Sequence, residues 1–232
     1  MRYLILSLVA ALITSQAHAI IWGGNEVDDP FSDATCLVSS LASYGSYIYN
    51  FPSKYDAVFF PHTDSQSIWY CGESGYASFM GDFEELTAEE RVDVAQLLAG
   101  ADTLGENPTV FERLERLEDV YSVRTMEDTF WPWFYRVLAH YYQSESPERA
   151  LEYRSLALPL VEQQIENGEP DGFMIQNLYV AGDYHRQLGN TDRAMEYFAQ
   201  ARTLEWVDES GTQRVGIDYW TEIINEREAL IP

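Results

Sequence analysis

Hydrophobic and polar residues follow two different patterns along the chain, and the change lies near residue 84. Residues 34–83 hold short apolar and aromatic runs separated by prolines and polar stretches, a pattern typical of short strands joined by turns. From residue 84 onward, apolar residues recur at intervals of three and four, which indicates amphipathic helices. The chain is therefore predicted to be mainly α, with a small N-terminal antiparallel β ribbon, an α+β fold.

The strand-like part is expected to form two to four short strands. The candidate runs are residues 44–49, 55–60 and 67–70. Residues 20–33 precede them and are polar and rich in glycine and aspartate, so we interpret them as a loosely held leader segment. So small a sheet is marginal alone, and we expect it to need a cross-link or packing against helices.

Start and stop signals divide the rest of the chain into helices. Thr87-Ala88-Glu89-Glu90 is a capping box, and Asn107-Pro108 is a typical helix start. Helices are expected over residues 87–99, 108–122, 129–142 and 146–165, with a bend at Pro159. A last helix is expected over residues 216–230.

The first 19 residues have the features of a secretory signal peptide. Arg2 gives a basic start, residues 4–13 are apolar, and Ala17-His18-Ala19 supplies small residues for cleavage after Ala19. A retained membrane anchor is the alternative, but the apolar run is short for a membrane span. We therefore expect a periplasmic or secreted protein, with no stable membrane insertion after signal cleavage.

The formal net charge of −24 is extreme for 232 residues. Such a chain repels nucleic acid and anionic membrane surfaces, so neither is an expected partner. The charge has two explanations: solubility in an extracytoplasmic medium, or a cationic partner. Lys54 is the only lysine, and every other basic residue is arginine.

Cys36 and Cys71 are the only two cysteines. In an exported chain such a pair predicts a disulfide. The bond would close a loop of about 35 residues, which by chain entropy stabilises the fold by roughly 3–4 kcal/mol.

Residues 178–204 place large and small residues at the spacing of two closely packed antiparallel helices. This stretch resembles a tetratricopeptide repeat (TPR). The matching positions are Leu178 as the large first residue, Ala181 and Gly182 as the small pair, Gly189-Asn190 as the turn, and Ala194, Phe198 and Ala201 in the second helix.

An earlier and weaker copy of the repeat aligns Ala150 with Ala194, at a spacing of 44 rather than 34 residues. Residues 84–232 are therefore expected to form a TPR-like helical domain rather than a regular array. Such a stack needs caps at both ends, which the helices near 87–99 and 108–122 and the helix over 216–230 could provide.

The strand-like part has a resemblance of its own. Cys36-Leu37-Val38-Ser39 and Cys71-Gly72-Glu73-Ser74-Gly75-Tyr76-Ala77 are similar to the two C-P-x-C knuckles, the second continuing as C-G-Y-A, of an uncharacterised bacterial family with TPR-like helices after a zinc ribbon. In each knuckle the leading cysteine remains and serine replaces the second. The resemblance implies that residues 34–83 are a degenerate zinc ribbon, closed by the disulfide instead of a metal.

Residual metal binding is the alternative for the ribbon. It would keep Cys36 and Cys71 as ligands and add His62 and Asp64 from the loop between them. Serine is a poor zinc ligand, and no histidine or cysteine falls at knuckle spacing, so no metal site and no cofactor is predicted.

No nucleophile elbow, P-loop or zinc-protease motif is present, so no catalytic residue is predicted. His140 and His185 are expected to be helix residues, and His62 with Asp64 is expected to form a turn. The aromatic helix over residues 129–142 is interpreted as core rather than as a ligand platform. An enzyme of the hydrolase type with an unrecognised His/carboxylate site stays open as the alternative.

The TPR resemblance also implies a binding surface, because the first helix of each pair lines a concave groove in that family. The positions that match are Gln176, Tyr179, Asp183, Arg186 and Gln187. A mixture of aromatic, acidic and basic groups suits a peptide ligand. We expect an exported, non-catalytic binding or scaffold protein whose partner is a protein or peptide, with a cationic one favoured by the charge.

Overall fold

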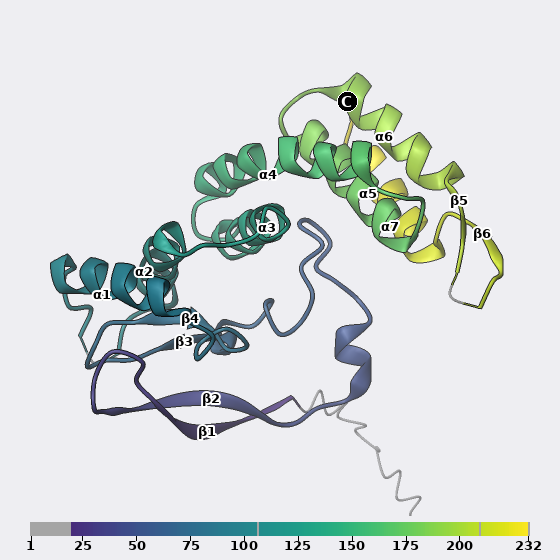
Figure 1. Ribbon diagram of the computed structural model, residues 1–232. Coiled ribbons are helices and arrows are strands. Elements are labelled where there is room, and N and C mark those ends of the chain that lie inside the picture. The colour runs from purple at the N-terminus through teal and green to yellow at the C-terminus, as the bar shows by residue number, and fades with distance from the viewer. Residues whose placement is uncertain (1–19, 106, 209, 232) are drawn as a thin grey trace, which may run out of the picture.

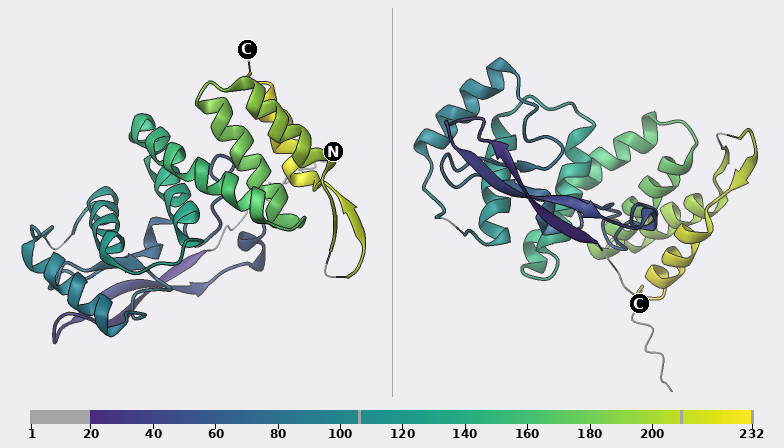
Figure 2. Two further views of the ribbon diagram at one scale, coloured as in Figure 1. Left: turned by 45° about the horizontal axis from the view of Figure 1, so that its top comes forward. Right: turned by 90° about the horizontal axis from the view of Figure 1, so that it is seen from below.

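The computed structural model describes residues 20–105, 107–208 and 210–231. The seven helices of this part follow one another along an arc, and the N-terminal strands and loops run along its inner side (Figures 1 and 2). The helices are α1 (Ala88–Gly100), α2 (Val110–Val123), α3 (Phe130–Tyr142), α4 (Pro147–Asn167), α5 (Gly172–Gln187), α6 (Thr191–Thr203) and α7 (Asp218–Glu228). The strands are β1 (Ile21–Asp28), β2 (Thr35–Ser43), β3 (Ile68–Tyr70), β4 (Ala77–Phe79), β5 (Glu205–Val207) and β6 (Gln213–Val215).

The predicted fold class is confirmed: the protein is mainly α, with small two-stranded antiparallel sheets. The capping box at Thr87 and Glu90 forms as expected and starts α1. The start of α2 differs from the prediction, because Thr109 rather than Asn107 is its N-cap, in a second capping box with Glu112. Helix α4 continues through Pro159 to Asn167.

The N-terminal part departs most from the predicted elements. Residues 21–28, expected to be a loosely held leader, form β1 and pair with β2 along its length. Of the three predicted strands, residues 44–49 contain a 3-10 helix (η1, Ser46–Tyr49), and residues 55–60 are irregular. Only β3, within residues 67–70, matches. In β2, Cys36 and Val38 are buried and Leu37 is exposed, a period of two that marks a strand lying on the core.

The predicted disulfide joins Cys36 at the start of β2 to Cys71, the residue directly after β3, with a Cα–Cα distance of 5.2 Å. Both cysteines are buried beside Tyr76, Phe83 and the α1 residue Val94. The bond therefore fixes the ribbon of β1 and β2 to the turn between β3 and β4, and this cluster packs on the first helices.

Helices α5 and α6 form a hairpin with the close approach that small residues predict. A Cβ atom on Gly182 would lie 2.5 Å from Phe198 Cδ1, far inside van der Waals contact. Gly189 makes the turn between the helices at φ 82°, a left-handed conformation that suits glycine. Ala194 and Ala201 are buried between the helices.

The chain after α6 contains a hairpin that the sequence patterns did not indicate. Strands β5 and β6 pair in antiparallel register, and the Trp206 indole N–H donates to the Gly216 carbonyl at 3.3 Å. Helix α7 then packs on α5, where Trp220 stacks on Tyr179 with ring centroids 4.9 Å apart. This helix closes the end of the row, as expected for residues 216–230.

The expected signal peptide, residues 1–19, lies outside the described residues. Within the part of the chain that is described, no helix has the length and apolar character needed to cross a membrane.

Reduction of the Cys36–Cys71 bond is expected to lower the free energy of unfolding by roughly 3–4 kcal/mol, because the bond closes a loop of about 35 residues. Urea unfolding of the mature chain with and without dithiothreitol measures the change. The double variant Cys36→Ala/Cys71→Ala is the control and should not respond to the reductant. Two free thiols in the unreduced exported protein, counted by mass spectrometry, would contradict the expected bond.

Candidate binding site

Residues 53–58, here called the groove segment, leave the ribbon and reach the inner side of the helices. Figure 1 shows this part of the chain, in blue between η1 and β3, rising toward α3 and α5. The segment folds on itself: the Ser53 N–H donates to the Val58 carbonyl at 2.7 Å, and the Ala57 N–H donates to the Ser53 carbonyl at 3.0 Å. Ala57 has φ 50°, so the tight turn holds a non-glycine residue in the left-handed region.

The side chain of Asp56 anchors the groove segment to the helices. Arg154 of α4 binds both carboxylate oxygens, with Nε at 2.8 Å from Oδ1 and Nη2 at 2.9 Å from Oδ2. The Tyr184 hydroxyl of α5 donates to Oδ1 at 2.9 Å. Asp56 is fully buried and Arg154 nearly so, which makes this a buried, bidentate and fully hydrogen-bonded ion pair.

The backbone of the groove segment is bound as well. Arg136 of α3 donates from Nε to the Asp56 carbonyl at 2.7 Å and from Nη2 to the Ala57 carbonyl. The Tyr179 hydroxyl donates to the Lys54 carbonyl. The inner faces of α3, α4 and α5 therefore bind a turn of the chain through three backbone carbonyls and one carboxylate, which is the chemistry of peptide recognition.

The two buried arginines, Arg136 and Arg154, have pKa values shifted in opposite directions. Burial lowers the pKa of Arg136, whose partners are neutral carbonyls. Burial also acts to lower the pKa of Arg154, but hydrogen bonding and charge attraction from Asp56 outweigh it and raise that pKa. Burial and the Asp56 carboxylate raise the pKa of Tyr184 well above its usual value, so the hydroxyl stays a donor. The Arg154 guanidinium therefore stays charged throughout the neutral range.

Four of the five predicted groove residues hydrogen-bond within the protein itself, Tyr179 to the groove segment and the other three to one another. Tyr179 and Asp183 are fully buried, and Arg186 and Gln187 are half-buried and hydrogen-bond to Asp183, each at 2.7 Å. Burial raises the pKa of Asp183 against the opposing effect of Arg186. Gln176 alone lines an open cleft. Their role in binding a partner stays a prediction.

That open cleft, here called the aromatic cleft, continues the groove past Pro52 toward the β5–β6 hairpin. Its volume is about 880 Å³. Phe173, at the first turn of α5, and Phe51 are 73% and 61% exposed. The lining contains six aromatic residues: Phe51, Phe59, Phe173, Trp206, Tyr219 and Trp220.

The carboxylates of the aromatic cleft have structural partners. Asp171 caps α5 by accepting from the Met174 N–H at 2.7 Å. Asp208 accepts from Ser210, Thr212 and Arg214, and the Ser210 hydrogen bond in particular lowers the pKa of Asp208. No histidine or cysteine lines the cleft in the described part of the chain. Aromatic faces with two carboxylates that already accept hydrogen bonds within the protein suit binding rather than proton transfer.

His62 and Asp64 lie in the expected turn, where the Asp64 N–H donates to the Pro61 carbonyl at 3.0 Å, but their side chains have different partners. His62 lies edge-on to Phe79 and Trp133, with ring centroids 4.9 and 4.7 Å away. Burial lowers the pKa of His62 to about 4. Asp64 instead accepts from the Trp22 indole N–H at 3.0 Å and from the Gln66 N–H at 3.0 Å.

Of the other two histidines, His140 is buried enough to lower its pKa, and His185 stacks on Tyr197. His185 Nε2 is 3.0 Å from Glu162 Oε1, which also accepts from the Tyr197 hydroxyl at 2.8 Å. This His/carboxylate pair joins α4, α5 and α6. Neither member lines the aromatic cleft.

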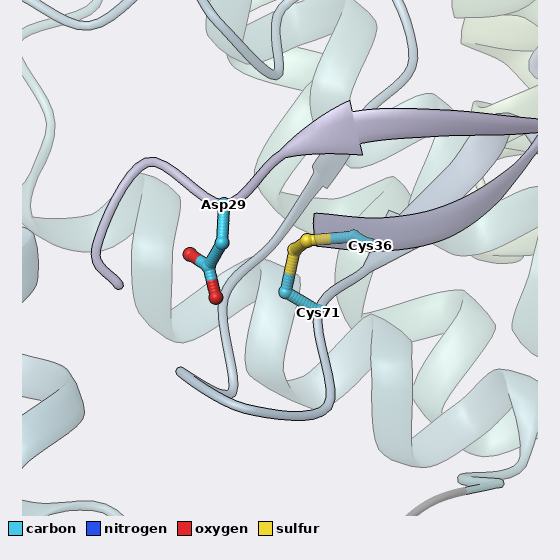
Figure 3. Close-up of side chains that lie close together, drawn as sticks. All are labelled: Asp29, Cys36 and Cys71. Carbon is cyan, nitrogen blue, oxygen red and sulfur yellow. A yellow bond between two sulfur atoms is a disulfide. The ribbon is translucent and has the colours of Figure 1, made fainter. Parts of the chain in front are cut away.

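Near the disulfide, the third group that could hold a metal is Asp29 rather than His62 or Asp64 (Figure 3). Asp29 accepts from the Phe31 N–H and the Ser32 hydroxyl, both at 2.9 Å, and so makes the turn between β1 and β2. The two sulfur atoms are bonded to each other, so neither is a thiolate ligand. With this bond closed, the cluster is a structural staple.

The aromatic helix α3 is core on one side, as predicted: Phe134, Val137 and Leu138 are buried. Trp131 and Tyr135 pack against the edge of this core and also line a second cleft of about 560 Å³, together with the α4 residue Gln163.

Comparison of the chain with family models, curated proteins and solved structures found no match. The site therefore rests on its own geometry. The residues that sequence patterns did not single out are Asp56, Arg136 and Arg154 of the groove and the lining of the aromatic cleft. One sequence signal for the groove existed: Asp56 is a lone acid inside an apolar run.

Replacing Asp56 by alanine is expected to cost about 3–5 kcal/mol of folding free energy, because it leaves the Arg154 guanidinium buried without its partner. Urea unfolding measures this loss. The matched control is Lys54→Met in the same segment, since Lys54 makes an exposed ion pair with Glu226 at 2.9 Å. That change is expected to cost less than about 1 kcal/mol. Equal effects of the two substitutions would show that the groove segment is not anchored through Asp56.

His62 is expected to make the protein less stable in acid. Its folded pKa of about 4 lies below the ordinary value of 6.5, so between these values the unfolded state binds the extra proton. Stability should fall as the pH drops from 6.5 toward 4, by about 1–2 kcal/mol from this group over the first one to two units. His62→Phe should flatten the pH dependence of urea unfolding in this range, while His140 titrates in both proteins. An unchanged pH profile would contradict the assignment.

Proposed function

We propose that this protein is an exported, non-catalytic binding or scaffold protein, and that a protein or peptide partner binds in the aromatic cleft at the open end of its TPR-like groove. One observation carries the proposal. The groove already holds a turn of its own chain, residues 53–58, with Arg136 and Tyr179 on backbone carbonyls and Arg154 on a side-chain carboxylate. The aromatic cleft continues the same groove, from Pro52 and Gln176 outward.

Two further features support this proposal. The helical hairpins α3–α4 and α5–α6 agree with the TPR-like interpretation, and the first helices of the pairs, α3 and α5, face the groove segment through Arg136, Tyr179 and Tyr184. The disulfide and the signal-like residues 1–19 support a periplasmic or secreted location, with cleavage after Ala19. The family relationship through a degenerate zinc ribbon remains part of this proposal.

The aromatic cleft is favoured as the partner site over the rest of the surface by its exposed aromatic side chains. Phe51 and Phe173 are large apolar groups held open to solvent at the two edges of one concave lining. Exposed aromatic residues around a concavity are typical of binding sites, whereas singly exposed apolar residues such as Leu37 are common on any surface.

Panning a displayed random-peptide library on the immobilised mature chain tests the proposal. Enriched peptides are expected to bind at least about tenfold more weakly to the Phe173→Ser variant, because an exposed aromatic anchor contributes on the order of 1.4 kcal/mol or more. The Leu37→Ser variant is the matched control, because Leu37 is equally exposed but lies on β2. If no peptide is enriched, or if the enriched peptides bind Phe173→Ser as well as the wild type, the proposed function is wrong.

A further inference from the structure

We propose that the aromatic cleft selects a cationic peptide segment, whose arginine or lysine side chain lies against the aromatic faces and near the carboxylate of Asp171. This inference rests on the proposed function and adds the chemistry of the partner. It draws on the aromatic lining, on the distribution of charge around the cleft, and on a similar arrangement inside the protein's own groove.

The lining offers ring faces that a flat or compact cation can contact. Phe51 and Tyr219 lie with ring centroids 5.3 Å apart at 49°, and Tyr219 and Trp220 lie 5.0 Å apart at 69°. Phe173 extends from the start of α5 into solvent. Because the π face of an aromatic ring is negative, a cation within about 6 Å of the ring centroid is attracted, and arginine also stacks flat on it.

The groove already contains an arginine placed between an aromatic ring and an acid, as proposed for the complex. Arg227 of α7 lies over the ring of Tyr55, 4.3 Å from its centroid, and 4.0 Å from the buried carboxylate of Asp183. A guanidinium is thus held between an aromatic face and an acid a short distance from the cleft. The cleft offers the same two partners, aromatic faces and the acid Asp171, without a basic residue in its lining.

The basic residues near the aromatic cleft are already paired with carboxylates, so a cation that binds in the cleft must come from a partner. Residues 169–232 contain twelve acidic and five basic residues. Each of these five arginines has a carboxylate within 4.0 Å in the described structure: Arg186, Arg193, Arg202, Arg214 and Arg227. Lys54, beside the cleft, is paired with Glu226. The region therefore keeps a negative potential that attracts a cationic segment and disfavours an acidic one.

Asp171 is the lining carboxylate assigned this role, because the other one, Asp208, already pairs with Arg214 at 2.7 Å. Asp171 lies in the cleft lining and caps α5 with one oxygen, Oδ1. An asparagine at the same position keeps the helix cap, because its side-chain oxygen accepts the same hydrogen bond, but it removes the charge. The charge of Asp171 can therefore be tested without loss of the α5 start.

The test uses the mature full chain and two synthetic nonapeptides, titrated by isothermal calorimetry. One alternates arginine with leucine, and the other replaces each arginine by citrulline, which has nearly the same shape and no charge. The arginine peptide is expected to bind at least about tenfold more tightly, with affinity that falls as salt is raised. Equal affinity for the two peptides would overturn the inference.

Two substitutions locate the effect in the cleft. Asp171→Asn is expected to weaken the arginine peptide about threefold or more and to leave the citrulline peptide unchanged. Phe173→Leu keeps an apolar side chain but removes the ring face, and is expected to weaken the arginine peptide more than the citrulline peptide. Glu152→Gln, which removes one exposed charge on α4, is the matched control and should change neither.

The outcomes separate this inference from the proposed function. If Asp171→Asn and Phe173→Leu leave the arginine peptide unaffected, the cation is bound elsewhere and the inference is wrong. If library panning yields neutral or acidic peptides that require Phe173, the cleft binds peptides but not through a cation, so the function survives and the inference fails. If neither synthetic peptide binds and panning enriches nothing, both are wrong.

Discussion

The buried ion pair between Asp56 and Arg154 is the contact on which the arrangement of this protein depends. The two residues are 98 positions apart, and the pair joins the N-terminal segment to the middle of the helical row. A buried charge is stable only when its partner and its hydrogen bonds are all in place. Arg154, Tyr184 and the backbone contacts of Arg136 meet this requirement together. The position of the groove segment follows from this pair, and with it the position of Pro52, Phe51 and Phe59 at the edge of the aromatic cleft.

A second set of contacts fixes the ribbon at the other end of the row. The disulfide holds β2 to the β3–β4 turn, and Arg124 of α2 pairs with Asp82 at 2.7 Å and with Glu90 of α1 at 3.1 Å. The ribbon and the groove segment are thus tied to the helices at two separate places. The chain between these two places cannot leave the inner side of the arc without breaking either the ribbon contacts or the Asp56–Arg154 pair. The part of the groove that residues 53–58 fill is therefore a structural interface. Partner binding is left to the part that remains open.

Much of the helical architecture could be predicted because its signals are local. Neighbouring residues are enough to predict the capping box at Thr87 and the close helix approach at Gly182. The disulfide is predicted because the chain has only two cysteines. The pairing of β1 with β2 was missed because a polar, glycine-containing strand has no distinct pattern of its own. Asp56 and Arg154 were missed because nothing in the sequence tells which of many acids and arginines meet across 98 residues. The cleft combines three distant segments, and tertiary packing alone creates it.

In this structure, residues 53–58 occupy the groove and leave the aromatic cleft as the open site. Hydrogen–deuterium exchange of the mature chain at neutral pH tests this most directly. The amides of Ala57 and Val58, which donate within the segment, are expected to exchange nearly as slowly as those in the middle of α5. Exchange of these amides within seconds, while α5 stays protected, would show that residues 53–58 do not occupy the groove in solution.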